Sequence, residues 1–177
     1  MNWFKLIALT LFLVGCGEAD RGKAYITSQE GGISVIDLNT MEVVNQLNAG
    51  GYPRGIGITK DGTHIITANK ADASVTVTNI LSNEIKSSIE VGINPEFVRV
   101  FNGQVFVSTE PSSKGKPPAK GEMNKEEEGD DDDRTPAKIA VVDLEEGKKI
   151  REITAGTETE GIEMSKDGTQ MRVTNEA

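Results

Sequence analysis

The sequence predicts an all-β fold built from a repeated unit of roughly forty residues, and three observations support this prediction. First, the similar segments AYITSQE, IITANK and VFVSTE begin at residues 24, 65 and 105. Second, each copy contains short runs rich in β-branched residues, which suit a pleated, half-buried sheet. Third, the chain after residue 23 shows no sustained 3.6-residue hydrophobic period. We therefore expect strands and turns, almost without helix.

Each copy also contains the turns that four short strands need. After the opening segment come the runs ISVID, SVTVT and IAVVD, which are the next predicted strands. The polar breaks LNTMEV, LSNEI and LEEGKKI follow these runs and allow the chain to reverse. KDGT, FNG and KDGT then place Asp-Gly or Asn-Gly between apolar runs, which is the strongest short-range hairpin signal. Each copy is therefore predicted to form four antiparallel strands.

A repeat of roughly forty residues with four antiparallel strands is the blade of a β-propeller. Residues 23–177 are thus predicted to form about three four-stranded antiparallel blades. Complete propellers have roughly four to eight blades, because each blade covers the apolar faces of its neighbours. We therefore expect the chain to be the N-terminal part of a propeller of about seven blades. The alternative is that several identical arcs assemble into a ring.

The phrases YIT…GGISVIDLNTMEVV, GGYPRGIGITKDGTHIITAN and MRVTN resemble the YVTN family of bacterial β-propeller repeats. The resemblance covers almost all of the chain from residue 23 to residue 176, outside one insertion. That family is similar to the haem d1 domain of cytochrome cd1 and to propellers associated with quinone-cofactor alcohol catabolism. The resemblance allows haem d1 or a quinone cofactor, although the residues themselves make no cofactor evident. Because propellers host many unrelated activities, the motif is specific for fold alone.

The first sixteen residues, MNWFKLIALTLFLVGC, have the features of a secretory signal followed by a lipid-attachment site. The apolar run after Lys5 is about half as long as the roughly 20 residues that cross a bilayer. Residues 1–15 are therefore interpreted as a signal peptide. LVGC resembles a bacterial lipobox, which implies cleavage before Cys16 and lipidation of its thiol. The alternative is a simple signal peptide with an incidental cysteine.

This resemblance predicts a cellular location. Residues 16–22 would form a short tether, and Gly17, in place of aspartate, suggests the periplasmic face of the outer membrane. Cys16 is the only cysteine, so no internal disulfide is expected. Because Lys5 is the only charged residue of the signal peptide, cleavage changes the net charge from −9 to −10. Such a surface repels nucleic acid and anionic lipid, so membrane contact is expected through acyl chains alone and no nucleic-acid partner is expected.

Residues 111–136 interrupt the third copy. Their sequence, PSSKGKPPAKGEMNKEEEGDDDDRTP, is rich in proline, glycine and charge and almost without apolar residues. Such a segment cannot bury enough surface to offset its ordering entropy, so we expect a disordered loop between the second and third strands of the third blade. Residues 126–133 allow weak calcium binding as an alternative. They lack the alternating ligands of a calcium loop, so no metal site is predicted.

Residues with recognisable catalytic chemistry are scarce. His64 is the only histidine and directly follows a predicted turn, so it is interpreted as an exposed turn residue. A haem ligand or a triad member is the alternative. The chain has no Cys-x-x-Cys-His sequence and no set of His and Cys residues for zinc. No catalytic residue is therefore predicted.

One set of charged residues falls at equivalent positions of the three copies. Aligning YPRG, NPEF and ETEG places Arg54, Glu96 and Glu160 at one position, and Glu158 adds a carboxylate to the third copy. Each precedes the apolar run that should form the innermost strand, in the loop at the mouth of a propeller's central channel. Side chains from different blades would converge there and hold a polar ligand through directed hydrogen bonds. The alternative is that these side chains only face solvent.

Two classes of function follow. The first is a non-catalytic binding or scaffolding module that recognises a periplasmic protein or a small polar ligand. The absence of a nucleophile–base pair favours this class. The second is a redox accessory or enzyme, either haem d1-like, quinone-cofactor-linked or lactonase-like, whose active residues lie in further blades.

Overall fold

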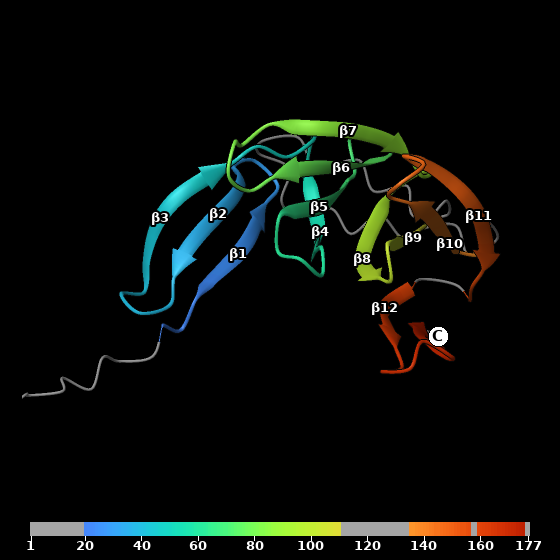
Figure 1. Ribbon diagram of the computed structural model, residues 1–177. Helices are drawn as coiled ribbons and strands as arrows, with labels where there is room; N and C mark the ends of the chain where they lie inside the picture. Colours follow the sequence, from blue (N-terminus) through green and yellow to red (C-terminus); the bar gives the residue numbers. More distant parts are fainter. Residues whose placement is uncertain (1–19, 111–134, 157–158, 176–177) are drawn as a thin grey trace, which may run out of the picture.

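The computed structural model describes residues 20–110, 135–156 and 159–175 (Figure 1). These residues form thirteen strands and no helix, so the predicted all-β fold is confirmed. The strands are β1 (Lys23–Ser28), β2 (Gly32–Asp37), β3 (Glu42–Leu47), β4 (Pro53–Ile58), β5 (His64–Asn69), β6 (Ser74–Asn79), β7 (Ile85–Glu90), β8 (Pro95–Phe101), β9 (Gln104–Thr109), β10 (Lys138–Asp143), β11 (Lys148–Thr154), β12 (Thr159–Met164) and β13 (Met171–Asn175). Within these ranges there is no helix that could span a membrane.

The strands form four antiparallel sheets that fan out around a common centre (Figure 1). Two sheets are complete blades, with the orders β4-β5-β6-β7 and β8-β9-β10-β11. The described parts of the other two are β1-β2-β3 and β12-β13. In Figure 1, β4, β8 and β12 lie toward the centre of the fan, while β3, β7 and β11 lie along its outer rim. This is the expected propeller blade, with its first strand innermost.

The core lies between the blades, because adjacent residues on a strand point to opposite faces of the sheet. On β5, Ile65 packs with Ile33 and Val35 of the preceding blade. The next residue, Ile66, packs on the other face with Val105 and other residues of the following blade. A third cluster joins Phe106, Ile139 and Val141 of the second complete blade to β12 and β13. Both faces of a complete blade are therefore covered by its neighbours.

The hairpin between the third and fourth strands of each blade has one repeated geometry. The side chains of Asp37, Asn79 and Asp143 each accept hydrogen bonds from the backbone N–H groups two and three residues later, at 2.7–3.3 Å. The residue four positions later has a left-handed backbone, with φ of 60° at Met41, 58° at Asn83 and 64° at Gly147. These turns match the polar breaks predicted from the sequence.

The KDGT turns are also fixed by their aspartates. Thr59 Oγ1 and the backbone N–H of Thr63 donate to Asp61 Oδ1 at 2.6 and 3.1 Å. These hydrogen bonds lower the pKa of Asp61 from 3.8 to about 2. Asp167 has the same surroundings, with Ser165 as the first cause, and its pKa is also lowered to about 2. Each carboxylate thus stabilises a hairpin that connects the first two strands of a blade.

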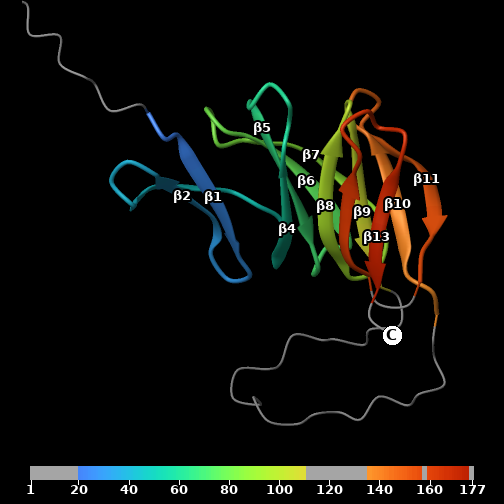
Figure 2. The same cartoon turned by 90° about the horizontal axis from the view of Figure 1, so that it is seen from below.

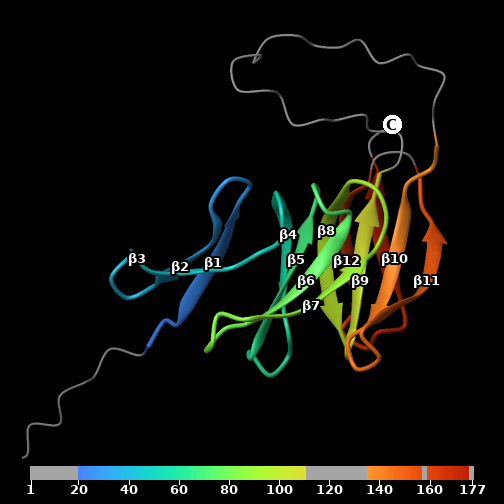
Figure 3. The same cartoon turned by 90° about the horizontal axis from the view of Figure 1, so that it is seen from above.

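The first blade lies at one end of the arc and β12–β13 lie at the other (Figures 2 and 3). Tyr25 on β1 packs against the cluster shared with the next blade, whereas Ile26 and Val43 are 52% and 58% exposed. The outer face of the first blade is therefore uncovered by the described residues. The predicted insertion at residues 111–136 falls between β9 and β10, which are the second and third strands of their blade. Most of it lies outside the described residues.

Candidate site at the mouth of the blades

The three inner strands have β-bulges near their starts, and the charged residues predicted from the sequence lie in these bulges. The register of pairing with the neighbouring strand shifts at each bulge. The shift lies between Pro53 and Ile56 on β4, between Pro95 and Val98 on β8, and between Thr159 and Gly161 on β12. Arg54, Glu96 and Glu160 are the second residues of these strands. The sequence predicts a loop here, and the structure instead places all three residues inside the strands. A bulge keeps the strand paired while it re-aims the side chain, which explains the difference.

Arg54 connects three blades. Its guanidinium donates through Nη1 to Oε1 of Glu96, which joins β4 to β8. Its carbonyl oxygen accepts a hydrogen bond of 2.6 Å from Thr27 Oγ1 on β1. The side chains of Arg54 and Glu96 are 31% and 13% exposed, so this ion pair is partly shielded from water. Glu160 is exposed, and no ion pair joins it to another described residue.

Two glycines allow β4 and β8 to approach closely. A Cβ atom on Gly55 would lie 2.0 Å from the carbonyl oxygen of Glu96 and 2.9 Å from the backbone nitrogen of Val98. A Cβ atom on Gly57 would lie 2.8 Å from Cγ2 of Val100. Any larger residue would separate the two strands. This close approach brings Arg54 within reach of Glu96.

Lys70 and Glu110 occupy equivalent places after β5 and β9, beside the Arg54–Glu96 pair. The backbone N–H of Lys70 donates to Tyr52 O at 3.1 Å, and that of Glu110 donates to Asn94 O at 3.3 Å. Burial lowers the pKa of Lys70, the Arg54 guanidinium lowers it further, and the Glu110 carboxylate opposes both effects. Glu110 is only 6% exposed. Basic residues of one blade therefore face acidic residues of the next.

The loops that precede the inner strands are held by a repeated packing contact. A Cβ atom on Gly50 would lie 2.4 Å from Asn69 Nδ2, one on Gly156 would lie 2.7 Å from Asn175 Cγ, and one on Gly92 would lie 3.4 Å from Thr109 Cγ2. Two residues after Gly50 and Gly92, Tyr52 and Asn94 have φ of 54° and 50°. Such a backbone is strained for a tyrosine, and strained residues cluster at ligand sites. We call residues 50–54, 69–72, 92–96 and 109–110 the mouth.

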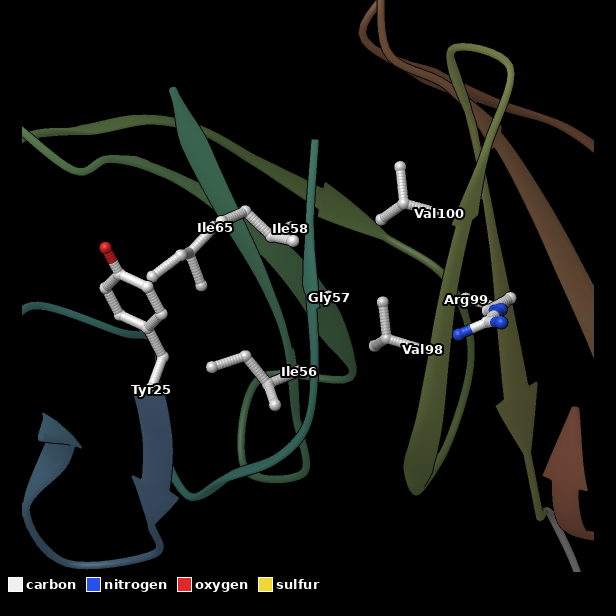
Figure 4. Close-up of a pocket in the computed structure, with 8 residues that line it drawn as sticks. All are labelled: Tyr25, Ile56, Gly57, Ile58, Ile65, Val98, Arg99 and Val100. Atoms are coloured by element: carbon white, nitrogen blue, oxygen red, sulfur yellow. The ribbon is translucent and has the colours of Figure 1, made fainter. Parts of the chain in front are cut away.

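A pocket of about 290 Å³ lies along the same inner strands (Figure 4). Tyr25, Ile56, Ile58 and Ile65 lie on one side of β4, and Val98 and Val100 lie between β4 and β8 (Figure 4). Arg99 points away from β4, and its guanidinium pairs with Glu163 of β12. The pocket is therefore mostly apolar, and it begins two residues beyond Arg54 on β4.

The remaining predicted residues have different outcomes. Glu158, Cys16, the signal peptide 1–15 and the acidic tract 126–133 lie outside the described residues. The tether 16–22 is described only from residue 20. His64 begins β5, at the end of the strand away from the mouth. Its Nδ1 lies 2.7 Å from Thr63 Oγ1, and its Nε2 lies 3.4 Å from Asn79 Nδ2.

Among the described residues, histidine offers no axial ligand at the mouth for the haem d1 group that the resemblance allows. Haem iron takes axial ligands such as histidine, cysteine, methionine or tyrosine. His64 is the only histidine. Both of its ring nitrogens face polar neighbours, at the end of β5 away from the mouth. No group of three or more His, Cys, Asp or Glu residues suited to a metal ion occurs in the described ranges.

Sequence analysis missed Lys70 and Glu110 as members of the mouth. The signal was available, because both residues end the repeated segments IITANK and VFVSTE. What the sequence could not show is that the turn after β5 folds onto the loop before β4. Two backbone hydrogen bonds, Lys70 N to Tyr52 O and Ala71 N to Gly51 O, each 3.1 Å, produce that contact.

Comparison with known proteins supports the fold. A family model described as YNCE-like beta-propeller matches residues 18–104. No curated protein matches the chain in sequence. Among solved structures, Kuenenia stuttgartiensis hydrazine synthase is similar with a TM-score of 0.69 and 19% identity, over 87% of this chain and 39% of that one. A functionally unknown protein from Desulfotomaculum acetoxidans DSM 771 is similar with a TM-score of 0.60 and 15% identity, over 81% of this chain and 40% of that one.

The chain thus spans about two fifths of the length of these two solved chains. At such identities the similarity concerns the fold alone. It agrees with the four sheets that pack face to face around a common centre, and with the inner position of the first strand of each blade. The chain is a β-propeller protein, of which the described residues form two complete blades and parts of two more.

Proposed function

We propose that the protein is a non-catalytic binding module whose mouth, together with the equivalent bulge at Glu160, holds a small polar ligand or a polar segment of a periplasmic protein. One observation carries the proposal: equivalent bulges on three neighbouring inner strands present Arg54, Glu96 and Glu160 at the same end of the blades. Rigid strands position these side chains more accurately than loops would. Charged groups from different blades can then bind one polar ligand by directed hydrogen bonds.

Native mass spectrometry of the protein purified from a bacterial cell envelope tests this proposal. We expect a co-purifying mass that is lost in the double variant Arg54→Glu, Glu160→Gln. The matched control is Lys86→Glu, which reverses an exposed charge on the outer strand β7 and should keep the bound mass. A mass retained by the double variant, or no bound mass in the unaltered protein, would reject the mouth as the binding site.

We further propose that a lipid on Cys16 anchors the module to the periplasmic face of the outer membrane. The sequence LVGC before Gly17 supports this location. Separation of membranes after expression of the full chain tests it. Replacement of Cys16 by serine should release the protein from the outer-membrane fraction, and continued sedimentation with that fraction would contradict the lipid anchor.

The second candidate, a redox accessory or enzyme, would need its reactive residues outside the described part of the chain. The resemblance of the repeats to the YVTN family, which is similar to the haem d1 domain and to quinone-cofactor-associated propellers, supports this candidate. A visible absorption band in the protein purified under reducing and oxidising conditions would favour it over a binding module.

A further inference from the structure

Two neighbouring cations of one blade, Arg54 and Lys70, meet at the mouth, and we propose that together they bind a carboxylate group of the ligand. This inference rests on the proposed function and specifies the chemistry of its ligand. The two residues come from β4 and from the turn after β5, so both belong to the same blade. The acidic residues that face them come from the next blade.

Both cations have hydrogen-bond donors to spare. A guanidinium has five N–H donors and an ammonium has three. Arg54 uses Nη1 to bind Glu96, and its other N–H groups have no acceptor among the described residues. The Lys70 ammonium likewise donates to no described residue, and Glu110 acts on it through charge alone. An oxygen anion placed between the two side chains would satisfy donors of both.

The fold holds these cations together against their mutual repulsion. Hydrogen bonds from Lys70 N to Tyr52 O and from Ala71 N to Gly51 O, each 3.1 Å, fasten the Lys70 turn to the loop that leads into β4. The hydrogen bond from Thr27 fixes the backbone of Arg54. Burial and the nearby guanidinium both disfavour the charged form of Lys70. A bound anion would favour the charged form of Lys70 and would so offset both effects.

The surroundings favour a carboxylate over a more highly charged anion. The planar guanidinium matches a carboxylate in a bidentate arrangement. Glu96 already neutralises part of the Arg54 charge, and the Glu110 carboxylate acts on Lys70. A phosphate dianion would meet this negative field, whereas a single carboxylate would be repelled less.

The test is an NMR titration of the full chain with sodium propionate and with propionamide, which has the same shape without the charge. We expect propionate to cause saturable shifts at the backbone amides of residues 52–55 and 70–71, and propionamide to cause none. Lys70→Met should weaken propionate binding about tenfold, the effect of losing one charged hydrogen bond. The control Lys86→Met removes an exposed lysine from the outer strand and should leave binding unchanged. Inorganic phosphate should bind more weakly than propionate.

A second readout is the pKa of Lys70 itself, followed through its side-chain carbon and nitrogen signals. Saturating propionate should raise this pKa, and Arg54→Gln should raise it without ligand, because the guanidinium lowers it. Equal shifts with propionate and propionamide, no saturable shift with propionate, or unchanged binding by Lys70→Met would each overturn the inference. If that happens while the Arg54→Glu, Glu160→Gln variant still loses its co-purifying mass, the mouth remains a binding site for a ligand without a carboxylate.

Discussion

Replacing Gly55 by alanine tests the close contact between β4 and β8 on which the mouth depends. The added Cβ atom would lie 2.0 Å from the carbonyl oxygen of Glu96 and 2.9 Å from the backbone nitrogen of Val98. Both are backbone atoms, so neither can move aside by changing a rotamer. Overpacking of this kind costs about 1–3 kcal/mol, and backbone overlap lies at the upper end. Alanine also lowers the entropy of the unfolded chain, which returns about 0.5 kcal/mol.

We therefore expect Gly55→Ala to lower the free energy of unfolding by about 2.5 kcal/mol. Gly62→Ala is the matched control, because a Cβ atom at Gly62 meets nothing within 4 Å. Gly62 has φ of 70°, so its replacement costs only the left-handed strain of about 1 kcal/mol. Urea unfolding of both variants, compared at equal m-values, measures the two costs.

The reasoning is refuted if Gly55→Ala is no more destabilising than Gly62→Ala. That result would mean that β4 and β8 are separated enough to accept a methyl group. A second readout concerns the mouth. When β8 is pushed away from β4, the Arg54–Glu96 pair should open, and the NMR signals of the Arg54 side chain should lose their protection from exchange with water.

Three further predictions concern the core and the turns. Ile66→Ala, in the fully buried cluster between the two complete blades, should cost about 3 kcal/mol in thermal or urea unfolding, and a loss below about 1 kcal/mol would contradict the packing. Met41→Gly should stabilise the protein by about 0.5 kcal/mol because φ is 60° there, whereas Gly147→Ala at the equivalent position should cost about 1 kcal/mol. The pKa values of Asp61 and Asp167 are each lowered to about 2. The two carboxylates therefore stabilise the folded state above pH 3.8, and this stabilisation is lost as the pH falls through about 2. NMR titration should give these values, and Asp61→Asn should reduce the acid sensitivity of unfolding; a normal pKa for Asp61 would show that its turn is open.

The repeat and its strands could be predicted because hydrophobic alternation and turn chemistry are local properties. Ile65 and Ile66 illustrate the limit of this approach. Their adjacency suggests a strand buried on both faces, but only the structure shows that they belong to two different interblade clusters. The KDGT hairpins were predictable because Asp-Gly is a strong turn signal, and the structure adds the hydrogen bonds of Asp61.

The mouth could be predicted only in part. Alignment of the copies placed Arg54 and Glu96 at equivalent positions, and the structure joins them in an ion pair. The bulges were not predictable, because a bulge depends on how two strands pair and leaves no distinct pattern in either strand. Nothing in the sequence marks Gly55, although its lack of a side chain allows the interstrand contact. Lys70 was missed because its role depends on a turn folding onto a loop some twenty residues earlier in the chain.

The radial packing of the sheets also determines how the molecule should open. Each sheet contacts its immediate neighbours, so stability spreads along the arc as a series of nearest-neighbour interfaces. The blades β4–β7 and β8–β11 are covered on both faces by other described sheets, whereas β1–β3 and β12–β13 each have one such interface. Amide hydrogens of β5, β6, β9 and β10 should therefore exchange with solvent only through openings of high free energy. Those of β2 and β13 should exchange through local openings of lower free energy. An arc of this kind loses its order from the two ends inward, and the mouth, which lies between the two best-protected blades, is the last part to be released.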